Sequence, residues 1–293
     1  MSPATDPPRP RRSVLYMPGA NERALQKAAE LDADAVILDL EDAVAPDAKD
    51  RARQLVHTAV TDGRFGTREV VIRVNGTDTA WFDDDLAAVA AAAPDAVLVP
   101  KVSTAAQVHE IETAVDGAGI AARTALWAML ETPAAVLHAE SITTASDRLT
   151  VFVMGTNDLV KELHAVHEPG RGPLLGALGW CLTAVRAAGK VVIDGVYNDV
   201  RDTAGFTAEC DQAHRLGFDG KTVIHPSQVG PCNAAFSPTE AQIAEAHEII
   251  TAFEEAEAAG RGVVTVGGRM IENLHVAEAR RTLAIADSID DRD

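Results

Sequence analysis

Residues 35–42 read AVILDLED, an uninterrupted apolar run that ends in a group of acidic side chains. A short, continuous run rich in β-branched residues is typical of a strand buried on both faces of a parallel sheet. Comparable runs recur along the chain at 13–17, 69–74, 96–99, 125–130, 150–154, 191–196 and 222–224. Longer stretches with helical periodicity separate most of them, for example over 133–140. The alternation predicts repeated strand–helix units around a parallel sheet.

Eight such strands are the number that closes a (β/α)8 TIM barrel. An open, doubly wound sheet is the alternative. It would favour a G-x-G-x-x-G or Walker pattern, whereas the turn after the first run reads PGANER at 18–23. We therefore predict a disordered tail over 1–12, a barrel over 13–236, and a C-terminal helical extension over 237–293. The extension contains a strand-like piece at 263–266 and a last helix over 278–288, and it would cap the barrel or a neighbouring subunit.

Composition narrows the functional class. The 293 residues carry a net charge of −18, which disfavours nucleic acid as a partner. No apolar run reaches the 18 or more residues of a membrane span, and residues 1–12 lack the apolar stretch of a signal peptide. The three cysteines form no C-x-x-C, so neither a zinc site nor a disulfide framework is indicated. We expect a cytoplasmic protein with reduced thiols and no membrane contact.

Polar side chains follow nearly every predicted strand. The carboxyl ends of barrel strands meet on one face, where enzymes of this fold place their active sites. Charged groups collected there are costly unless they pair or bind a ligand. The residues concerned are Asp39, Glu41, Arg73, Lys101, Glu131, Asp158, Asp194 and His225.

Glu131 and Asp158 end two consecutive strands, so their carboxylates can approach one cation. Two carboxylates without cysteine or clustered histidine favour a hard, oxygen-loving ion, and Mg²⁺ fits because it keeps several positions for water and substrate. The alternative is that these acids cap helices or form salt bridges, above all Asp158, which precedes a helical pattern.

Arg73 ends the third strand, and its planar fork suits a substrate carboxylate. Pairing with Asp39 or Glu41 on the adjacent strand is the alternative, and both can hold together. Lys101 follows the fourth strand near the same mouth, and the same two interpretations apply to it. For His225, a satisfied histidine at a strand end is at least as plausible as a catalytic one.

Several motifs now resemble a known family. In order they are RRSVLYMPG (11–19), ILDLEDAVAPDAKDRAR (37–53), VIRVNG (71–76), VPKV (99–102), MLETP (129–133), GTNDL (155–159), IDGVY (193–197) and GKTVIHPSQV (220–229). Together they resemble the HpcH/HpaI aldolase/citrate lyase family, in particular its CoA-ester lyase branch, over about residues 11 to 288.

The resemblance implies roles for individual residues. Glu131 and Asp158 match the family's Mg²⁺ ligands, and Glu131 also borders the substrate. Arg73 matches the arginine that binds the substrate carboxylate. Asp39 and Glu41 match acids that hold this arginine and the metal-bound waters.

Further matches lie later in the chain. Asp194 and Val196 fall in a segment that lines the acyl pocket, and Lys221 and His225 belong to the strand-8 signature. Glu272, in MIENL at 270–274, matches an aspartate that reaches a neighbouring subunit's site as acid/base, with a side chain one methylene longer. This arrangement implies a homotrimer or hexamer.

The implied function is a Mg²⁺-dependent lyase that splits a 3-hydroxyacyl-CoA of the malyl, methylmalyl or citramalyl type into a 2-keto acid and an acyl-CoA. Adding water to the thioester instead would make a thioesterase. A citrate lyase beta subunit, an aldolase of 2-keto-3-hydroxy acids, and a non-catalytic CoA-ester-binding protein remain as alternatives.

Overall fold

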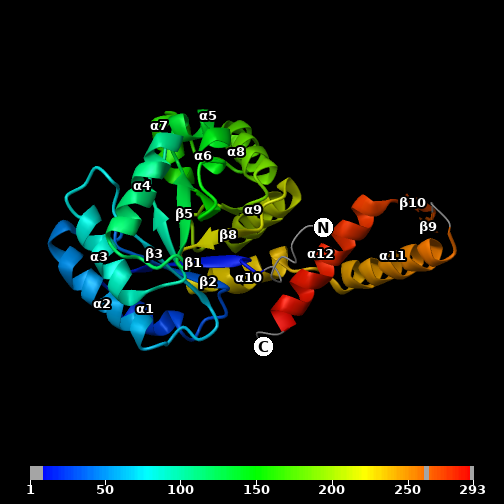
Figure 1. Cartoon of the computed structure of the whole chain (residues 1–293), viewed down its shortest axis with the longest axis horizontal. Coiled ribbons are helices and arrows are strands. Elements are labelled where there is room, and N and C mark those ends of the chain that lie inside the picture. Colours follow the sequence, from blue (N-terminus) through cyan, green and yellow to red (C-terminus); the bar gives the residue numbers. More distant parts are fainter. Residues whose placement is uncertain (1–8, 261–263, 291–293) are drawn as a thin grey trace. The chain divides into compact units, whose positions relative to one another are not determined.

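The computed structural model describes residues 9–260 and 264–290. Eight parallel strands close into a barrel in which each strand pairs with the next and β8 returns to β1 (Figure 1). The strands are β1 Ser13–Pro18, β2 Ala35–Asp39, β3 Glu69–Arg73, β4 Ala96–Val99, β5 Ala125–Leu130, β6 Leu149–Met154, β7 Val191–Asp194 and β8 Gly220–Val223. The predicted (β/α)8 barrel is confirmed.

Helices surround these strands in chain order (Figure 1). They are α1 Glu22–Ala28, α2 Lys49–Thr61, α3 Phe82–Ala92, α4 Ala105–Gly117, α5 Pro133–Leu137, α6 Ala139–Thr143, α7 Thr156–Glu162, α8 Leu175–Ala187, α9 Thr203–Leu216 and α10 Pro226–Phe236, with 3₁₀ turns at Pro46–Ala48 and Gly172–Leu174. Two differ from expectation. The helix expected over 133–140 is split at His138, and α10 was not predicted because Pro231 and Gly230 resemble loop residues.

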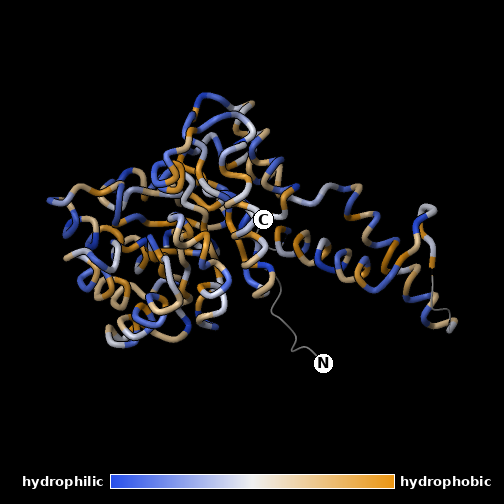
Figure 2. Tube along the Cα trace, turned by 90° about the horizontal axis from the view of Figure 1, so that it is seen from above, coloured by the Kyte–Doolittle hydropathy of each residue, from blue (hydrophilic) through white to orange (hydrophobic). Residues whose placement is uncertain are grey.

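Two apolar layers explain why the strands read as continuous apolar runs. One layer fills the barrel, with side chains such as Ile37, Val71 and Trp127. The other lies between the strands and the helices, with Leu38, Ile72 and others. Successive residues of one strand point alternately into these layers, so most strand positions are buried. Figure 2 shows hydrophobic segments of the trace in the interior of this unit.

The junction between β7 and β8 is short. Two residue pairs, Ile193↔Gly220 and Asp194↔Lys221, form its register, whereas β5 and β6 pair over five positions. Buried charges reinforce it: Lys221 Nζ donates to Asp194 Oδ2 at 2.8 Å and to Glu209 Oε1 at 2.7 Å. Arg171 Nη1 donates to Asp194 Oδ1 at 2.7 Å. This group, Asp194, Lys221, Glu209 and Arg171, is called the ionic cluster below.

Asp194 is fully buried in that cluster. Burial alone would raise its pKa, but the charges and hydrogen bonds of Lys221 and Arg171 outweigh the burial and hold the pKa below its usual value. The cluster therefore links β7, β8, α9 and the segment before the second 3₁₀ turn, as long as its charges stay matched.

Residues from Ser237 onward form a second compact unit, separate from the unit Arg11–Phe236. It contains α11 Glu240–Ala258, the antiparallel pair β9 Val264–Val266 and β10 Arg269–Ile271, and α12 Asn273–Asp290. A capping box between Thr239 and Gln242 starts α11. The tail predicted over 1–12 lies mostly outside the described residues, as does residue 263 of the expected strand.

The three cysteines are buried and unpaired. In the described residues no helix combines the length and the apolar character that a bilayer span requires.

Candidate functional site

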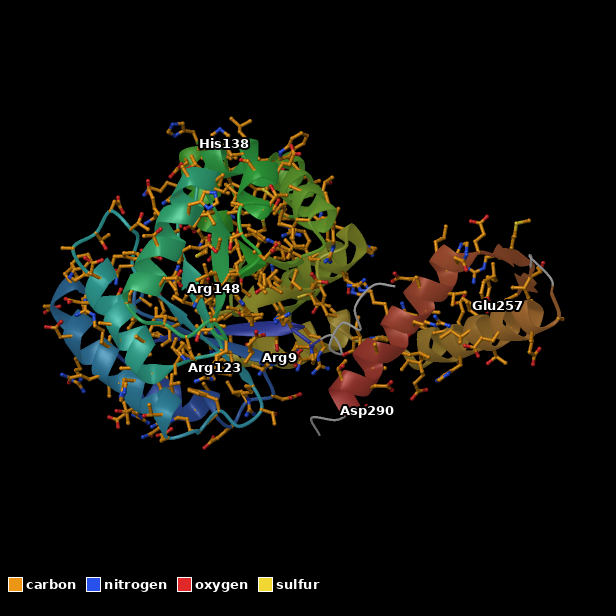
Figure 3. The ribbon with its side chains drawn as sticks, viewed as in Figure 1. Arg9, Arg123, His138, Arg148, Glu257 and Asp290 are labelled. Atoms are coloured by element: carbon orange, nitrogen blue, oxygen red, sulfur yellow. The ribbon has the colours of Figure 1, made fainter. Side chains whose placement is uncertain are left out.

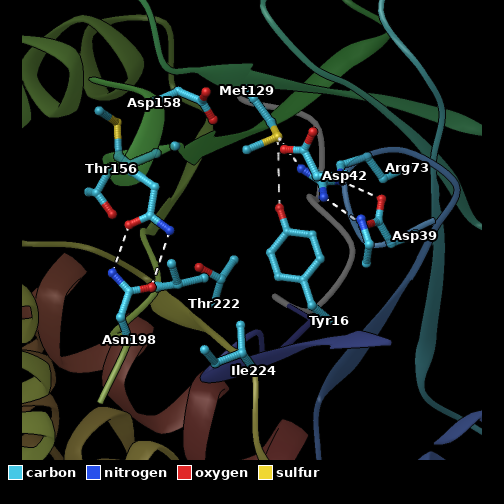
Figure 4. Close-up of a pocket in the computed structure, with 15 residues that line it drawn as sticks. Tyr16, Asp39, Asp42, Arg73, Met129, Thr156, Asp158, Asn198, Thr222 and Ile224 are labelled. Atoms are coloured by element: carbon cyan, nitrogen blue, oxygen red, sulfur yellow. Dashed lines mark hydrogen bonds and ion pairs between the residues drawn. The ribbon is translucent and has the colours of Figure 1, made fainter. Parts of the chain in front are cut away.

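A cavity of about 360 Å³ opens at the carboxyl ends of the barrel strands (Figure 4). Its lining comes from β1, β2, β3, β5, β6 and β8 and from the segments that follow β2, β6 and β7. Of the residues predicted from the sequence, four line it: Asp39, Arg73, Asp158 and Val196. The barrel thus brings together side chains from opposite ends of the sequence.

Arg73 is held rigidly at this mouth. Its Nε and Nη2 each donate to one oxygen of Asp39 at 2.7 Å, and its Nη1 lies 2.9 Å from Glu41 Oε2. Burial alone would raise the pKa of Asp39, but Arg73 outweighs it and the pKa falls below its usual value. The predicted pairing of Arg73 with both acids is present. Nη1 also donates to Met129 Sδ at 3.7 Å, whereas Nη2 contacts no second acceptor among residues 9–260 and 264–290, so its other hydrogen can bind a ligand.

Lys101 joins the same group from the end of β4. Its Nζ lies 3.1 Å from Glu41 Oε1, and its backbone N donates to Glu131 Oε1 at 2.7 Å. Lys101 adopts φ +57°, the left-handed region that is uncommon for residues other than glycine. The strained backbone therefore aims an amide directly at the Glu131 carboxylate.

Glu131 is 1% exposed, and its Oε2 has no hydrogen-bond partner among the described residues. Burial, reinforced by the charges of Glu41 and Asp158, raises its pKa to about 8. A buried carboxylate oxygen without a partner is costly, and a bound cation would remove that cost.

Gly155, at the end of β6, packs directly against this carboxylate. A Cβ on Gly155 would lie 2.2 Å from Glu131 Oε2 and 2.3 Å from Glu131 Cβ. The glycine is therefore required for Glu131 to keep its position.

Asp158 is the third residue of α7, and Gly155 occupies the N-cap position without a side-chain hydrogen bond. The alternative that Asp158 caps this helix is therefore wrong. Its half-buried carboxylate points into the cavity from α7 (Figure 4).

The charge at the mouth is unbalanced. Five carboxylates gather there, against the two cationic side chains of Arg73 and Lys101: Asp39, Glu41, Asp42, Glu131 and Asp158. No group of three or more histidine, cysteine or acidic side chains in ligand geometry exists within residues 9–260 and 264–290. The unpartnered Glu131 Oε2, with the Asp158 carboxylate close enough to raise the pKa of Glu131, fits a divalent ion that takes two carboxylates and fills its other positions with water or substrate oxygens.

Asp194 lies behind the site, because its carboxylate faces the ionic cluster and the residue is fully buried. We therefore interpret it as a residue that supports the strand end rather than one that touches a ligand. Val196, two residues further on, lines the mouth cavity and also a second cavity of about 520 Å³.

The remaining sequence candidates lie elsewhere. His225 is exposed, and its Nδ1 hydrogen-bonds Ser227 Oγ at 2.8 Å. Figure 3 labels His138, an exposed residue that was not among the predicted site residues, at the edge of the barrel unit. Glu272 belongs to the second unit, where it is exposed and its carbonyl accepts the first backbone hydrogen bonds of α12.

Comparison with known protein families identifies the family of this chain. The family model described as HpcH/HpaI aldolase/citrate lyase matches residues 12–226. The chain belongs to this family. A second model, described as a C-C bond lyase of the TIM-barrel fold, matches residues 179–288. The sequence-based prediction of the family is therefore confirmed, and both matching models describe proteins whose family includes carbon–carbon lyases.

Individual relatives within the family extend along the whole chain. A (3S)-malyl-CoA thioesterase of Cereibacter sphaeroides is 51% identical over 96% of this chain and 96% of its own length. An L-malyl-CoA/beta-methylmalyl-CoA lyase of Rhodobacter capsulatus is 33% identical over 95% and 96%. The crystal structure of protein CitE from Mycobacterium tuberculosis in complex with magnesium, acetoacetate and coenzyme A superposes with a TM-score of 0.76 at 29% identity, covering 94% of this chain and 97% of that one.

Sequence reasoning missed several cavity residues of this family member. Tyr16 and Met129 sit within apolar strand runs and resemble core residues, although both line the cavity. Asn157 in the first turn of α7 and Asn198 in the loop after β7 exchange amide hydrogen bonds of 3.1 and 2.8 Å. Asp42 is exposed and lines the cavity, and its place directly after the Asp39–Glu41 pair was the available signal.

Proposed function

We propose that this chain is a Mg²⁺-dependent enzyme of malyl-type 3-hydroxyacyl-CoA esters, with Glu131 and Asp158 as its metal ligands. The observation that carries the proposal is the buried, unpartnered Oε2 of Glu131 beside the Asp158 charge. The magnesium and coenzyme A of the CitE crystal structure support it.

The bound metal would supply a Lewis acid for the carboxylate and hydroxyl oxygens of the substrate. The protein supplies orientation. Arg73 stays charged because its pKa is raised well above its usual value: burial alone would lower it, but Asp39 and other acidic neighbours outweigh the burial. Held by Asp39 and Glu41, its free N–H can bind a substrate oxygen in one geometry.

We propose hydrolysis of the thioester as the net reaction, because the relative at 51% identity is a (3S)-malyl-CoA thioesterase. Water adds to the thioester carbon, the C–S bond breaks, and CoA leaves as the thiol, with malate as the other product. Asp42, exposed at the cavity wall, is the base that we assign to the water proton.

Carbon–carbon cleavage is the second candidate, favoured by the family and by the malyl-CoA/beta-methylmalyl-CoA lyase relative. In this reaction the substrate hydroxyl loses its proton and the C–C electrons move onto the thioester, giving a 2-keto acid and an acyl-CoA enolate. Glu272 of a neighbouring subunit would then protonate the enolate carbon.

That role requires an oligomer. We propose a cytoplasmic homotrimer or hexamer, which light scattering on the purified protein will test. A monomeric but fully active protein would remove Glu272 of a neighbour from the mechanism.

Product analysis separates the candidates. We expect (3S)-malyl-CoA with Mg²⁺ to give free CoA thiol and malate, whereas C–C cleavage would give acetyl-CoA and glyoxylate. Methylmalyl-, citramalyl- and citryl-CoA belong in the same panel. Binding without any product would support the non-catalytic alternative and contradict the proposal.

Variants test the site itself. Glu131→Ala and Asp158→Ala should abolish turnover while the far-ultraviolet circular dichroism stays unchanged. Glu110→Ala, which removes an exposed acid on α4, is the matched control and should keep wild-type turnover. Normal turnover in either site variant would refute the metal assignment.

A further inference from the structure

Tyr16 carries a hydroxyl group that the fold does not use. The ring rises from β1 into the mouth cavity, half-buried, with its hydroxyl directed at Met129 (Figure 4). The hydroxyl donates to Met129 Sδ at 3.8 Å. A thioether sulfur is a weak acceptor, so a better acceptor entering the cavity would capture this hydrogen.

The position of the hydroxyl is nevertheless well defined. The Arg73 guanidinium lies 4.9 Å from the centre of the Tyr16 ring, and Asp39 fixes Arg73 through two hydrogen bonds of 2.7 Å. A cation over the ring face orients the ring. The hydroxyl is therefore placed before any ligand arrives, which is what makes a donor effective in catalysis.

Tyr16 remains a donor rather than a base. Burial raises the pKa of its phenol well above the usual value, and the charge of Arg73 opposes this without cancelling it. The hydroxyl is thus protonated throughout the neutral pH range.

Other polar groups of the cavity wall are engaged or lie elsewhere. Asn157 and Asn198 bond each other, and the Thr222 hydroxyl donates to a backbone carbonyl of β7 at 3.0 Å. The Thr156 hydroxyl has no hydrogen-bond partner in the part of the chain that the structure describes, but it lies on α7, the helix of the proposed metal ligand. In Figure 4 Tyr16 stands apart from that helix, on the Arg73 side of the cavity.

We propose that the Tyr16 hydroxyl donates a hydrogen bond to the thioester carbonyl oxygen of the substrate. This inference rests on the proposed function. We assign the carboxylate and hydroxyl oxygens to the metal end, and we therefore place the thioester oxygen on the Arg73 side, in place of the carboxylate that the family resemblance assigns to Arg73. That oxygen gains negative charge in either reaction, whether water adds to the carbon or the C–C electrons move into an enolate, so Tyr16 is a catalytic residue in both.

Tyr16→Phe is the test, because it keeps the ring on Arg73 and removes one oxygen. We expect kcat to fall on the order of 10²-fold with KM changed less than about threefold. The chain has one other tyrosine, Tyr197, whose hydroxyl bonds Asp202 at 2.7 Å in the second cavity. Tyr197→Phe is the matched control and should keep wild-type kcat.

A binding measurement separates the carbonyl contact from pocket shape. A CoA thioether that lacks the carbonyl should bind wild type and Tyr16→Phe equally. In the Tyr197→Phe background, 3-fluorotyrosine labels position 16 alone. The labelled protein also carries Glu131→Ala, so that the added thioester is not hydrolysed. The ¹⁹F resonance of residue 16 should shift when the thioester is added, and it should shift much less when the thioether is added.

The outcomes are distinguishable. A wild-type protein inactive on every ester of the panel refutes the proposed function. An active wild type with an equally active Tyr16→Phe variant overturns the Tyr16 inference alone. Equal loss of thioether and thioester binding in Tyr16→Phe, or equal ¹⁹F shifts with both ligands, also overturns it, because the hydroxyl would then shape the pocket rather than bind the carbonyl.

Discussion

Gly155→Ala tests whether close packing against Glu131 creates the metal site. The added Cβ would lie 2.2 Å from Glu131 Oε2 and 2.3 Å from its Cβ, so the glutamate must move by about 1 Å to reach ordinary contact. Backbone φ of −92° at Gly155 tolerates alanine, which leaves the steric clash as the main effect.

Two magnitudes follow. Overpacking of this kind lowers the free energy of unfolding by about 1–3 kcal/mol. A displacement near 1 Å in a catalytic group lowers turnover by roughly 10²-fold. We expect Gly155→Ala to remain folded while it loses Mg²⁺ affinity and roughly 10²-fold in kcat.

Titration calorimetry with Mg²⁺, urea unfolding and turnover measure the three quantities on the same preparation. Gly179→Ala in α8 is the matched control: a Cβ there meets nothing within 4 Å, and removing a helix glycine should stabilise the protein by about 0.5–1 kcal/mol. Wild-type Mg²⁺ affinity in Gly155→Ala would refute the role of this contact.

Three further predictions concern charge. Asp194→Asn should lower the free energy of unfolding at pH 7 by about 3–5 kcal/mol because Lys221 stays buried with one anion fewer. The pKa of Asp194 is depressed in the folded state, so its contribution is complete above the unfolded pKa and is lost as pH falls; the difference from wild type in urea unfolding should shrink below about pH 4, and a constant difference down to pH 3 would contradict the assignment. Arg73→Lys keeps the charge but loses the two-point contact with Asp39, so kcat/KM should fall by about 10²-fold; near-normal kcat/KM would show that orientation is unimportant. Chelation should stop turnover and Mg²⁺ restore it, with melting temperature raised by Mg²⁺ in wild type but not in Glu131→Gln; equal stabilisation of both proteins would locate the ion elsewhere.

Much of the fold follows from local pattern. Each of the eight strands appears where an apolar run predicts it, because burial on both faces leaves a clear signature. Boundaries are less accurate: β7 ends at Asp194 rather than 196, since the chain leaves the barrel where Asp194 joins the ionic cluster. The helix α12 begins at Asn273, before the expected 278.

Some residues of the candidate site could also be predicted from the sequence, and others could not. Acids and bases at strand ends were predictable because charge stands out after an apolar run, as with Arg73 and Glu131. Tyr16 was not, because a tyrosine inside an apolar run also suits a core. Arg171 and Lys221 lie fifty residues apart on either side of Asp194, and no local pattern announces that they share one carboxylate.

A closed barrel has no free edge, yet the closure in this protein is not uniform around its circumference. The β7–β8 pairing is the shortest in the barrel. Ion pairs between side chains help to hold these two strands together there, whereas backbone pairing extends further between the other strands. Low pH, or a substitution that removes one charge of the ionic cluster, would therefore separate β7 from β8 before the other strands separate. Amide exchange should then begin in β7 and β8 while β5 and β6 remain protected, exposing two strand edges through which copies of the chain would aggregate.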